Sequence, residues 1–290
     1  MNLDNQNTEK SRQYLLAQRK LYSNAKIWTW LVWLAALSPV AAQLIKPYIP
    51  NAPEYFNLIS AVVGGGLAFL ISSTIKRKVE MAARMQEEFD LGVYEIPRNE
   101  GLTGRPITPD ERLKVVGNEK IPDNLTNWYS PVISTAPHPS LAILLCQREN
   151  VIWDWHLKLR TARILAVSAA VILILTILCG LFRKMQLNDW LLNVLSLVAV
   201  FLYVILQFAY SIAKIGESQR MIEEEINANI EAFKTANTVV GEQTLRLYQD
   251  RIFKNRTENY MAPDLLYKIS KIGVQTRTTT SSDEIIKSFA

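Results

Sequence analysis

The chain has 290 residues, 49% of them hydrophobic, and its 32 basic and 27 acidic side chains give a net charge of +5. The excess of basic residues lies mainly in the first 26 residues, whereas the other polar segments are nearly balanced. This distribution argues against a DNA- or RNA-binding surface and indicates a basic segment attracted to anionic lipid. Two cysteines are too few for a disulfide framework.

Four apolar blocks lie at residues 27–45, 56–75, 162–182 and 190–213. Each is close to the roughly 20 residues that a helix needs to cross the hydrocarbon core of a bilayer. The alternative is that the blocks are buried core helices of a soluble protein. The Lys/Arg clusters that flank two of the blocks argue against this alternative, because such clusters are typical of the ends of membrane spans. We therefore predict an all-α integral membrane protein with four transmembrane helices in two pairs. The predicted segments are residues 1–26, 27–75, 76–161, 162–213 and 214–290.

The distribution of basic residues also predicts an orientation. The loop between the first two blocks holds one basic residue, Lys46, whereas residues 1–26, 76–163 and 214–290 hold many. Because cytoplasmic segments are enriched in Lys and Arg, both termini and the 76–163 segment are expected in the cytoplasm. Residues 76–163 and the C-terminal region would then form a helical cytosolic domain.

The first pair of spans has two local features. A helix is expected from Ser11 into the first block, with a kink at Pro39. In the second block a small residue recurs at every fourth position, a pattern that lets helices approach closely in lipid. It indicates packing within one bundle, or else a subunit interface or a hinge in a pore-lining helix. The stripe consists of Ser60, Gly64, Ala68 and Ser72, and Gly65 and Gly66 beside it belong to the same candidate packing or hinge region.

The segment after the second block is expected to continue as a helix to Phe89 and then to become irregular, because prolines are frequent between residues 97 and 139. Short helices are predicted at Pro109–Val116 and Asp123–Trp128. From Ser140 to Phe182 one amphipathic helix is expected to turn into a membrane span. No proline or glycine interrupts Leu141–Cys179, so a movement of the polar half could pass rigidly into the bilayer.

The fourth block carries a polar stripe, formed by Asn193, Ser196, Tyr203, Gln207 and Tyr210. Polar groups in lipid need partners, so the stripe predicts either inter-helix contacts or the lining of a pore. No Asp, Glu, Lys or Arg lies deep in any block, which argues against an ion-coupled transporter.

Beyond Lys214 a long cytosolic helix is expected, with a short helix from Pro263 to Lys271. The long helix carries a heptad pattern that predicts packing on the 76–163 segment or an oligomeric contact. Its positions are Ile226, Ile230, Phe233, Asn237, Val240, Thr244 and Leu247.

No motif in the sequence supports catalysis. His138 and His156 belong to no zinc-spaced set, and phosphate-loop, nucleophile-elbow and paired-carboxylate patterns are missing. We therefore expect a protein that is not an enzyme and that needs no metal or cofactor. Arginines and aromatic residues alternate through the cytosolic segments, which would suit a nucleotide but also describes many helical surfaces.

Several short patterns are informative when taken together: Ala17–Lys26, Phe89-Asp90, Trp128-Tyr129, Leu141–Asn150 with Trp153-Asp154, Gln249–Phe253 with Arg256, and Pro263–Tyr267. In combination they resemble the SMODS-associated four-transmembrane effector family of bacterial CBASS anti-phage systems. The resemblance implies an effector of the bacterial inner membrane that is activated by a cyclic oligonucleotide from a neighbouring nucleotidyltransferase. Such an effector would oligomerise and permeabilise the membrane, which ends the infection by killing or arresting the cell.

With this resemblance, we expect a cyclic di- or trinucleotide to bind the cytosolic domain between the central helix and the segment after Leu245. The residues expected to bind it are Gln147, Arg148, Trp153, Arg251, Arg256 and Tyr260. A competing hypothesis is a non-conducting four-span anchor that recruits a cytosolic partner through its heptad helix. A small channel or transporter subunit is the third alternative.

Overall fold

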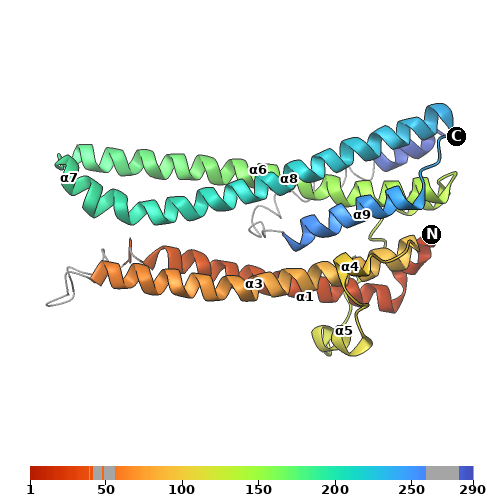
Figure 1. The fold of residues 1–290 in the computed structure, drawn as a ribbon, viewed down its shortest axis with the longest axis horizontal. Helices are drawn as coiled ribbons and strands as arrows, with labels where there is room; N and C mark the ends of the chain where they lie inside the picture. The colour runs from red at the N-terminus through yellow and green to blue at the C-terminus, as the bar shows by residue number, and fades with distance from the viewer. Residues whose placement is uncertain (39, 42–47, 49–55, 259–280, 290) are drawn as a thin grey trace.

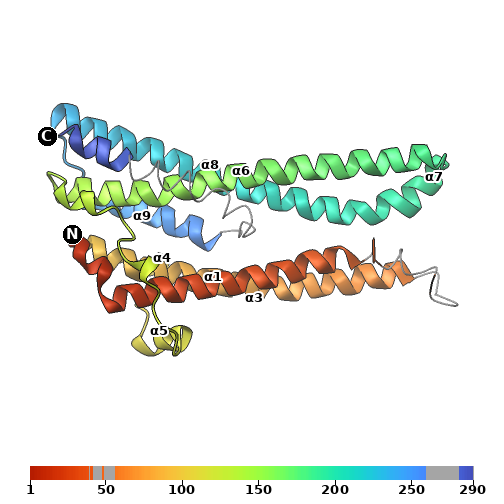
Figure 2. The same cartoon turned by 180° about the vertical axis from the view of Figure 1, so that it is seen from behind.

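The computed structural model describes residues 1–38, 40–41, 48, 56–258 and 281–289. Within these residues the chain is helical and has no β-strand, as the sequence predicts. Two long antiparallel hairpins lie side by side along the molecule, and both termini lie at the same end (Figures 1 and 2). Their helices are α1 (Glu9–Ala36) and α3 (Phe56–Tyr94) in one hairpin, and α6 (Pro139–Phe182) and α8 (Ser196–Ala236) in the other.

Shorter helices complete the polar end. The predicted helix α5 (Pro109–Val116) is confirmed, and it begins with a capping box in which Thr108 and Glu111 satisfy each other's backbone N–H groups. The predicted helix at Asp123–Trp128 is shorter than expected, because only Asp123–Leu125 is helical (η3) and Asn127 has a positive φ of 49°. The other elements are η1 (Leu3–Asn7), α4 (Glu100–Thr103), η4 (Pro131–Thr135), α7 (Leu187–Trp190), the π-helical turn η5 (Leu191–Leu195), α9 (Glu242–Thr257) and a helix at residues 281–287.

The uninterrupted central helix is confirmed, since α6 runs for 44 residues without a break. The prediction of a single heptad helix after Lys214 is wrong. Helix α8 ends at Ala236 because Asn237 adopts the left-handed conformation that often terminates helices, and Gly241 precedes a separate helix, α9. Ile226, Ile230 and Phe233 are buried in the core of the polar end, so this part of the pattern serves packing within the chain.

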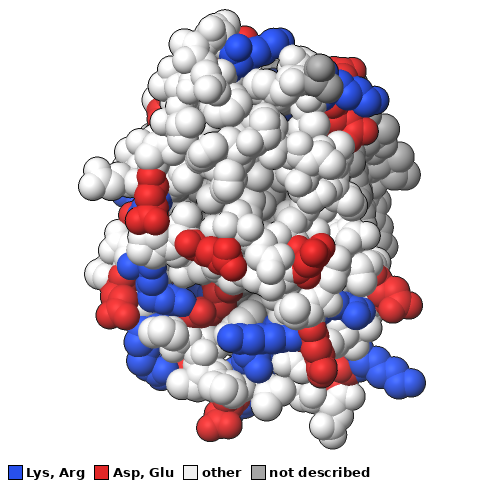
Figure 3. Space-filling model, turned by 90° about the vertical axis from the view of Figure 1, so that its right-hand side faces the viewer, with Lys and Arg blue, Asp and Glu red and all other residues white. Residues whose placement is uncertain are grey.

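The two ends of the molecule differ in character. At the end with the termini, a core of aliphatic and aromatic side chains is covered by intermixed acidic and basic residues (Figure 3). At the other end all four long helices expose large apolar side chains, among them Trp30 on α1, Phe69 on α3, Leu175 on α6 and Leu206 on α8. An apolar belt of this extent suits contact with lipid.

Two helices of the described part are long and apolar enough to cross a membrane: Pro139–Phe182, and Val198–Ala236 within α8. The other two predicted spans are not confirmed. The block at residues 27–45 includes residues 39 and 42–45, outside the described part, and with them the expected kink at Pro39. The block at residues 56–75 is helical as the first half of α3.

The small-residue stripe on α3 contains one position of close helix contact. A Cβ atom at Gly64 would lie 2.3 Å from Ser38 Oγ and 2.6 Å from the Ala35 carbonyl oxygen of α1. At Gly65 and Gly66 the same atom would meet nothing within 4 Å. Of the other stripe residues, Ser72 donates a hydrogen bond to the carbonyl of Ala68, and the side chain of Ser60 lies outside the described set.

Candidate functional site

A cluster of buried charged and polar side chains joins the two hairpins through α9, which lies between them in Figure 1. Glu87 and Asp90 are three residues apart on α3, so both face α9. Arg246, Gln249 and Arg256 are spaced by three and seven residues on α9, which places them on one face of that helix. We refer to these five residues as the junction cluster.

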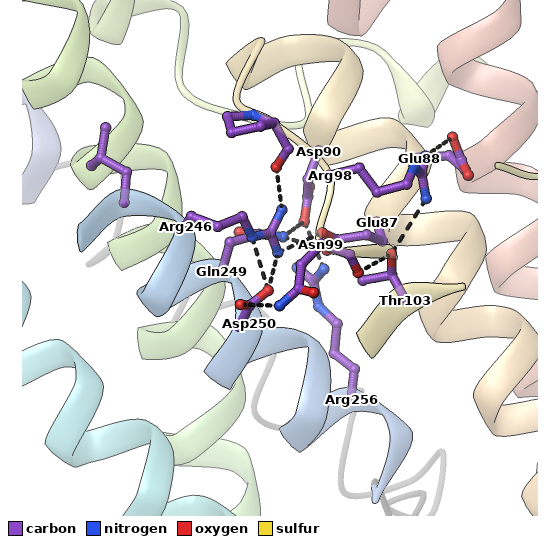
Figure 4. A network of polar contacts seen from close by, with 12 residues as sticks. Glu87, Glu88, Asp90, Arg98, Asn99, Thr103, Arg246, Gln249, Asp250 and Arg256 are labelled. Atoms are coloured by element: carbon purple, nitrogen blue, oxygen red, sulfur yellow. Dashed lines mark hydrogen bonds and ion pairs between the residues drawn. The ribbon is translucent and has the colours of Figure 1, made fainter. Parts of the chain in front are cut away.

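The junction cluster is held by direct ion pairs and hydrogen bonds (Figure 4). Arg256 Nη1 lies 2.6 Å from Asp90 Oδ2, and Arg246 Nη2 lies 2.8 Å from Glu87 Oε1. Gln249 Nε2 donates to Glu87 Oε2 at 2.7 Å and to Asp90 Oδ2 at 2.9 Å. Both carboxylates are fully buried. Because a buried charge is costly without its partner, this pairing fixes the position of α9 on α3.

The turn after α3 is fastened to the same place. Arg98 forms an ion pair of 2.7 Å with Glu88, and Asn99 Nδ2 donates to Asp250 Oδ2 at 2.7 Å. Asp250 also lies 2.7 Å from Arg246, so the charge of this arginine is shared between two carboxylates. The junction cluster therefore holds the irregular segment against both helices.

A chain of hydrogen bonds links the junction cluster to α6. Tyr129 donates its hydroxyl proton to Asp90 Oδ1 at 2.5 Å and accepts a hydrogen bond from Asn150 Nδ2 at 2.7 Å. The hydroxyl of Tyr94 lies 2.7 Å from that of Tyr129. Burial, with the charge of Asp90 as the next cause, raises the pKa of both tyrosines, so their hydroxyls stay protonated.

Burial and charge act against each other inside the junction cluster. Burial raises the pKa of Glu87, although the guanidinium of Arg246 opposes this. For Arg256, burial acts to lower the pKa, but the attraction of the acidic partners, Asp90 above all, outweighs it and raises the pKa above its ordinary value. Arg256 is thus a permanent cation.

The expected ligand-binding residues do not form one open pocket. Gln147 is fully buried and donates to the Leu245 carbonyl oxygen at 2.8 Å, beside the junction cluster that contains Arg256. Trp153 is half-buried on α6, and Tyr260 lies outside the described residues. Of the expected residues, Gln147 and Arg256 are linked through the junction cluster, by way of Gln249 and Asp90.

The other two arginines face different sides of α8. Arg148 Nε donates to Asn227 Oδ1 at 2.6 Å and lies 3.8 Å from Glu223, whereas Arg251 lies 2.5 Å from Glu225. Residues two apart on a helix point about 200° away from each other, so Glu223 and Glu225 hold their arginines apart. Burial lowers the pKa of Arg148, and the charge of Glu223 opposes this shift without cancelling it.

The acidic partners on α3 are what the sequence analysis missed. The sequence patterns singled out α9 through Arg251 and Arg256. They included Asp90 only as part of the Phe89-Asp90 pattern, without a role at the site, and did not include Glu87. A signal was present in the spacing of these two acids, three residues apart just before the aromatic-rich end of α3. Near them Lys158, buried on α6, pairs with Asp154, and burial lowers the pKa of its ammonium group, which Asp154 opposes.

The two tyrosines of the polar stripe on α8 are exposed. Tyr203 is 68% and Tyr210 is 67% exposed, whereas Leu202, Ile205 and Ala209 of the same helix are buried. Ser196 donates to the Leu192 carbonyl at 2.5 Å, and the side chain of Asn193 lies outside the described set. Gln207 lines a cavity between the hairpins. The inter-helix and pore-lining interpretations of this stripe both stay predictions.

Few side chains in the described part of the chain could act as metal ligands or nucleophiles. No group of three or more His, Cys, Asp or Glu residues there could hold a metal ion. Both cysteines are free, with Cys146 buried in the core and Cys179 exposed on α6. Burial, and next the charges of Glu149 and Asp90, raise the pKa of the Cys146 thiol, which makes it a poor nucleophile.

The fold and the junction cluster define a class: an all-helical protein with an apolar end suited to lipid and a polar end fastened by buried ion pairs. The sequence matches the family described as SMODS-associating 4TM effector domain over residues 3–285, so the chain belongs to this family. A curated relative from Bacillus cereus, named a probable CBASS effector molecule, is 27% identical over 283 residues that cover 91% of each chain. No solved structure matches. The family assignment made from the short sequence patterns is confirmed.

The C-terminal helix at residues 281–287 is attached to α6 through Glu149. Ser282 Oγ donates to Glu149 Oε1 at 2.7 Å, and the backbone N–H of Ser130 donates to Oε2 at 3.1 Å. Burial raises the pKa of Glu149 above its ordinary value of 4.5, although both hydrogen bonds oppose this. The carboxylate therefore joins three segments but is ionised at a cost.

A pH dependence follows from Glu149. An acid whose pKa is higher in the folded than in the unfolded protein contributes stability that is complete below the ordinary pKa of 4.5. This stability is lost as the pH rises through the raised pKa. Without the charge, Glu149→Gln can accept from the Ser130 N–H through its amide oxygen and donate to Ser282 Oγ through its amide nitrogen. Its unfolding temperature should therefore fall less than that of the parent between pH 5 and pH 7.5. An equal fall in both proteins would contradict this assignment.

Proposed function

We propose that this protein is a membrane effector of an anti-phage system that a cyclic oligonucleotide activates to form a pore in the bacterial inner membrane. The relative named a probable CBASS effector molecule supports the anti-phage role. Four spans with both termini in the cytoplasm agree with two hairpins whose polar ends lie together (Figure 1). No enzymatic step is required.

One observation supports ligand binding most directly. In the described part, seven buried side-chain nitrogen or oxygen atoms lack a hydrogen-bond partner. Three of them belong to residues expected to bind the ligand: Gln147 Oε1, Arg148 Nη1 and Arg256 Nη2. Buried polar atoms are almost always satisfied, so unpaired donors and acceptors here favour an additional partner. Guanidinium donors suit a phosphate, and an amide suits a base edge.

The same helices offer a route from ligand to membrane. Gln147 and Arg148 lie on α6, which continues without interruption into the apolar end as far as Phe182. A ligand phosphate would compete with Glu223 for Arg148 and with Glu225 for Arg251. Exchange of these partners would change how α8 packs on α6 and α9. A ligand that prefers the rearranged state shifts the equilibrium toward it.

Leakage of dye from liposomes tests the proposal. Purified full-length protein is reconstituted and titrated with a panel of cyclic di- and trinucleotides. Release of the dye with one compound at submicromolar concentration, and not with its linear form, is the expected result. If folded, inserted protein releases dye with none of them, the pore proposal fails and the non-conducting anchor becomes the better explanation.

Two arginine variants test the proposed ligand contacts. Arg148→Ala and Arg251→Ala should each abolish the ligand response or raise the ligand concentration that it requires by tenfold or more. Membrane insertion should be unchanged. Arg220→Ala is the matched control, because this arginine is exposed on α8 and its ion pairs within the described residues are with Glu217 and Glu224 of its own helix. If both test variants respond like the parent and the control, the proposed contacts are wrong.

A further inference from the structure

Basic side chains surround the molecule where its polar half meets its apolar half. Each long helix contributes at this level: Lys26 on α1, Lys76 on α3, Arg163 on α6 and Lys214 on α8. In a membrane protein, such a level coincides with the phosphates of the cytoplasmic leaflet. Two of these residues, Lys76 and Lys214, also line a cavity of about 630 Å³ between the hairpins.

The cavity has an apolar side formed by both hairpins. Trp33 of α1 packs edge-on against Phe208 and Phe201 of α8, with ring centroids 5.3 Å and 6.0 Å apart. Trp33 and Phe208 line the cavity together with Val32 and Val204. Because aromatic rings from separate hairpins meet here, the apolar wall is built from the contact between the hairpins.

The polar side of the cavity is mainly cationic. Lys76 and Lys214 are exposed, and neither forms an ion pair within the described part of the chain. Ser211 and Tyr210, which carry hydroxyl groups, also line the cavity. The acidic residue among the lining side chains, Glu258, is exposed at the end of α9. A ligand of this cavity therefore needs an anionic head and an apolar tail.

We propose that the cavity binds an anionic phospholipid between the two hairpins, with its phosphate at Lys76 and Lys214 and an acyl chain along Trp33 and Phe208. Two ammonium groups without an ion-pair partner among the described residues complement a phosphate whose lipid has no balancing positive charge. The volume lies within the range of roughly 300–1,000 Å³ that is usual for ligand sites. The lipid would be part of the interface between the hairpins, and a non-conducting protein would hold it equally well.

Lipid binding is measured on the purified full-length protein in a neutral detergent, by the rise in unfolding temperature on titration with short-chain phosphatidylglycerol. Two controls are titrated in parallel. Short-chain phosphatidylcholine has the acyl tails but no net charge, and inorganic phosphate has the negative charge but no tail. Of the three compounds, only phosphatidylglycerol should raise the unfolding temperature. An equal rise with phosphatidylcholine, or with phosphate alone, would overturn the proposal.

A matched pair of double variants locates the site. Lys76→Gln with Lys214→Gln should weaken phosphatidylglycerol binding on the order of twentyfold, at about fivefold for each lysine. Arg77→Gln with Arg163→Gln removes the same charge from exposed residues that do not line the cavity, and binding should stay within about twofold of the parent by the same estimate. Equal weakening by both pairs would mean general attraction to the surface and would contradict a site.

A third variant tests the cavity itself and keeps both lysines. Val204→Trp places a large ring in the apolar side, where the acyl chain is proposed to lie. Its folding is checked by the unfolding temperature without lipid. Folded Val204→Trp should lose at least tenfold in phosphatidylglycerol affinity, and unchanged affinity would show that the lipid binds elsewhere.

Discussion

Replacing Arg256 with alanine should lower the free energy of unfolding by about 3–5 kcal/mol, because the change leaves the buried charge of Asp90 without its partner. Asp90 is fully buried and Arg256 is 5% exposed, so water cannot replace the lost ion pair. Gln249 and Tyr129 would still donate to Asp90, but two neutral donors compensate only part of a missing cation. Denaturant unfolding in detergent, followed by circular dichroism, measures the loss.

Arg251→Ala is the matched control on the same helix. The side chains of Arg251 and Glu225 are 29% and 44% exposed, so their ion pair is screened by solvent and contributes about 0–1 kcal/mol. The two variants should separate stability from function: Arg256→Ala loses both, whereas Arg251→Ala stays folded and loses only the proposed ligand response. Equal destabilisation by both variants would show that the junction cluster does not hold α9 in place.

The second large effect is expected at Gly64, where α1 and α3 are in closest contact. Gly64→Ala should destabilise the protein by about 1–3 kcal/mol, because the added methyl group has to displace neighbouring atoms in a packed interface. One of these neighbours is the backbone oxygen of Ala35, 2.6 Å from the new atom, which cannot move without shifting α1. The same unfolding experiment measures the change.

Gly65→Ala is the control for Gly64→Ala, one residue further along the same helix. Its methyl group meets nothing within 4 Å, and alanine favours a helix over glycine by about 1 kcal/mol, so the variant should be neutral or more stable. If both variants behave alike, Gly64 is not a packing position, and the interpretation of the small-residue stripe as a subunit interface gains support.

Local sequence signals predicted much of the fold. Helical periodicity and the lack of proline and glycine predicted α6, and the short helix α5 beginning at Pro109 was predicted with its correct bounds. These signals succeed because helix formation depends on neighbouring residues within one or two turns. The break after Ala236 was missed, because the heptad pattern continues across Asn237 and Gly241, and apolar spacing does not show that two helices share it.

The candidate site was predicted only in part. Gln147 and Arg256 are linked indirectly, through Gln249 and Asp90, whereas Arg148 and Arg251 lie on different sides of α8. Arginine and aromatic content cannot distinguish a ligand contact from an internal ion pair. The partners that decide between them, Glu87 and Asp90, are more than 150 residues away from α9 in the chain.

The sequence by itself determined the family, the helical class, the uninterrupted central helix and the separation of a polar from an apolar half, since each depends on composition and local pattern. Only the tertiary structure decided which charges are buried together at the junction cluster, that α9 lies between the hairpins, and that Lys76 and Lys214 line one cavity. The physical reason is that these features depend on the packing of distant helices. A helix carries charge on several faces, and its neighbours determine which of them is buried.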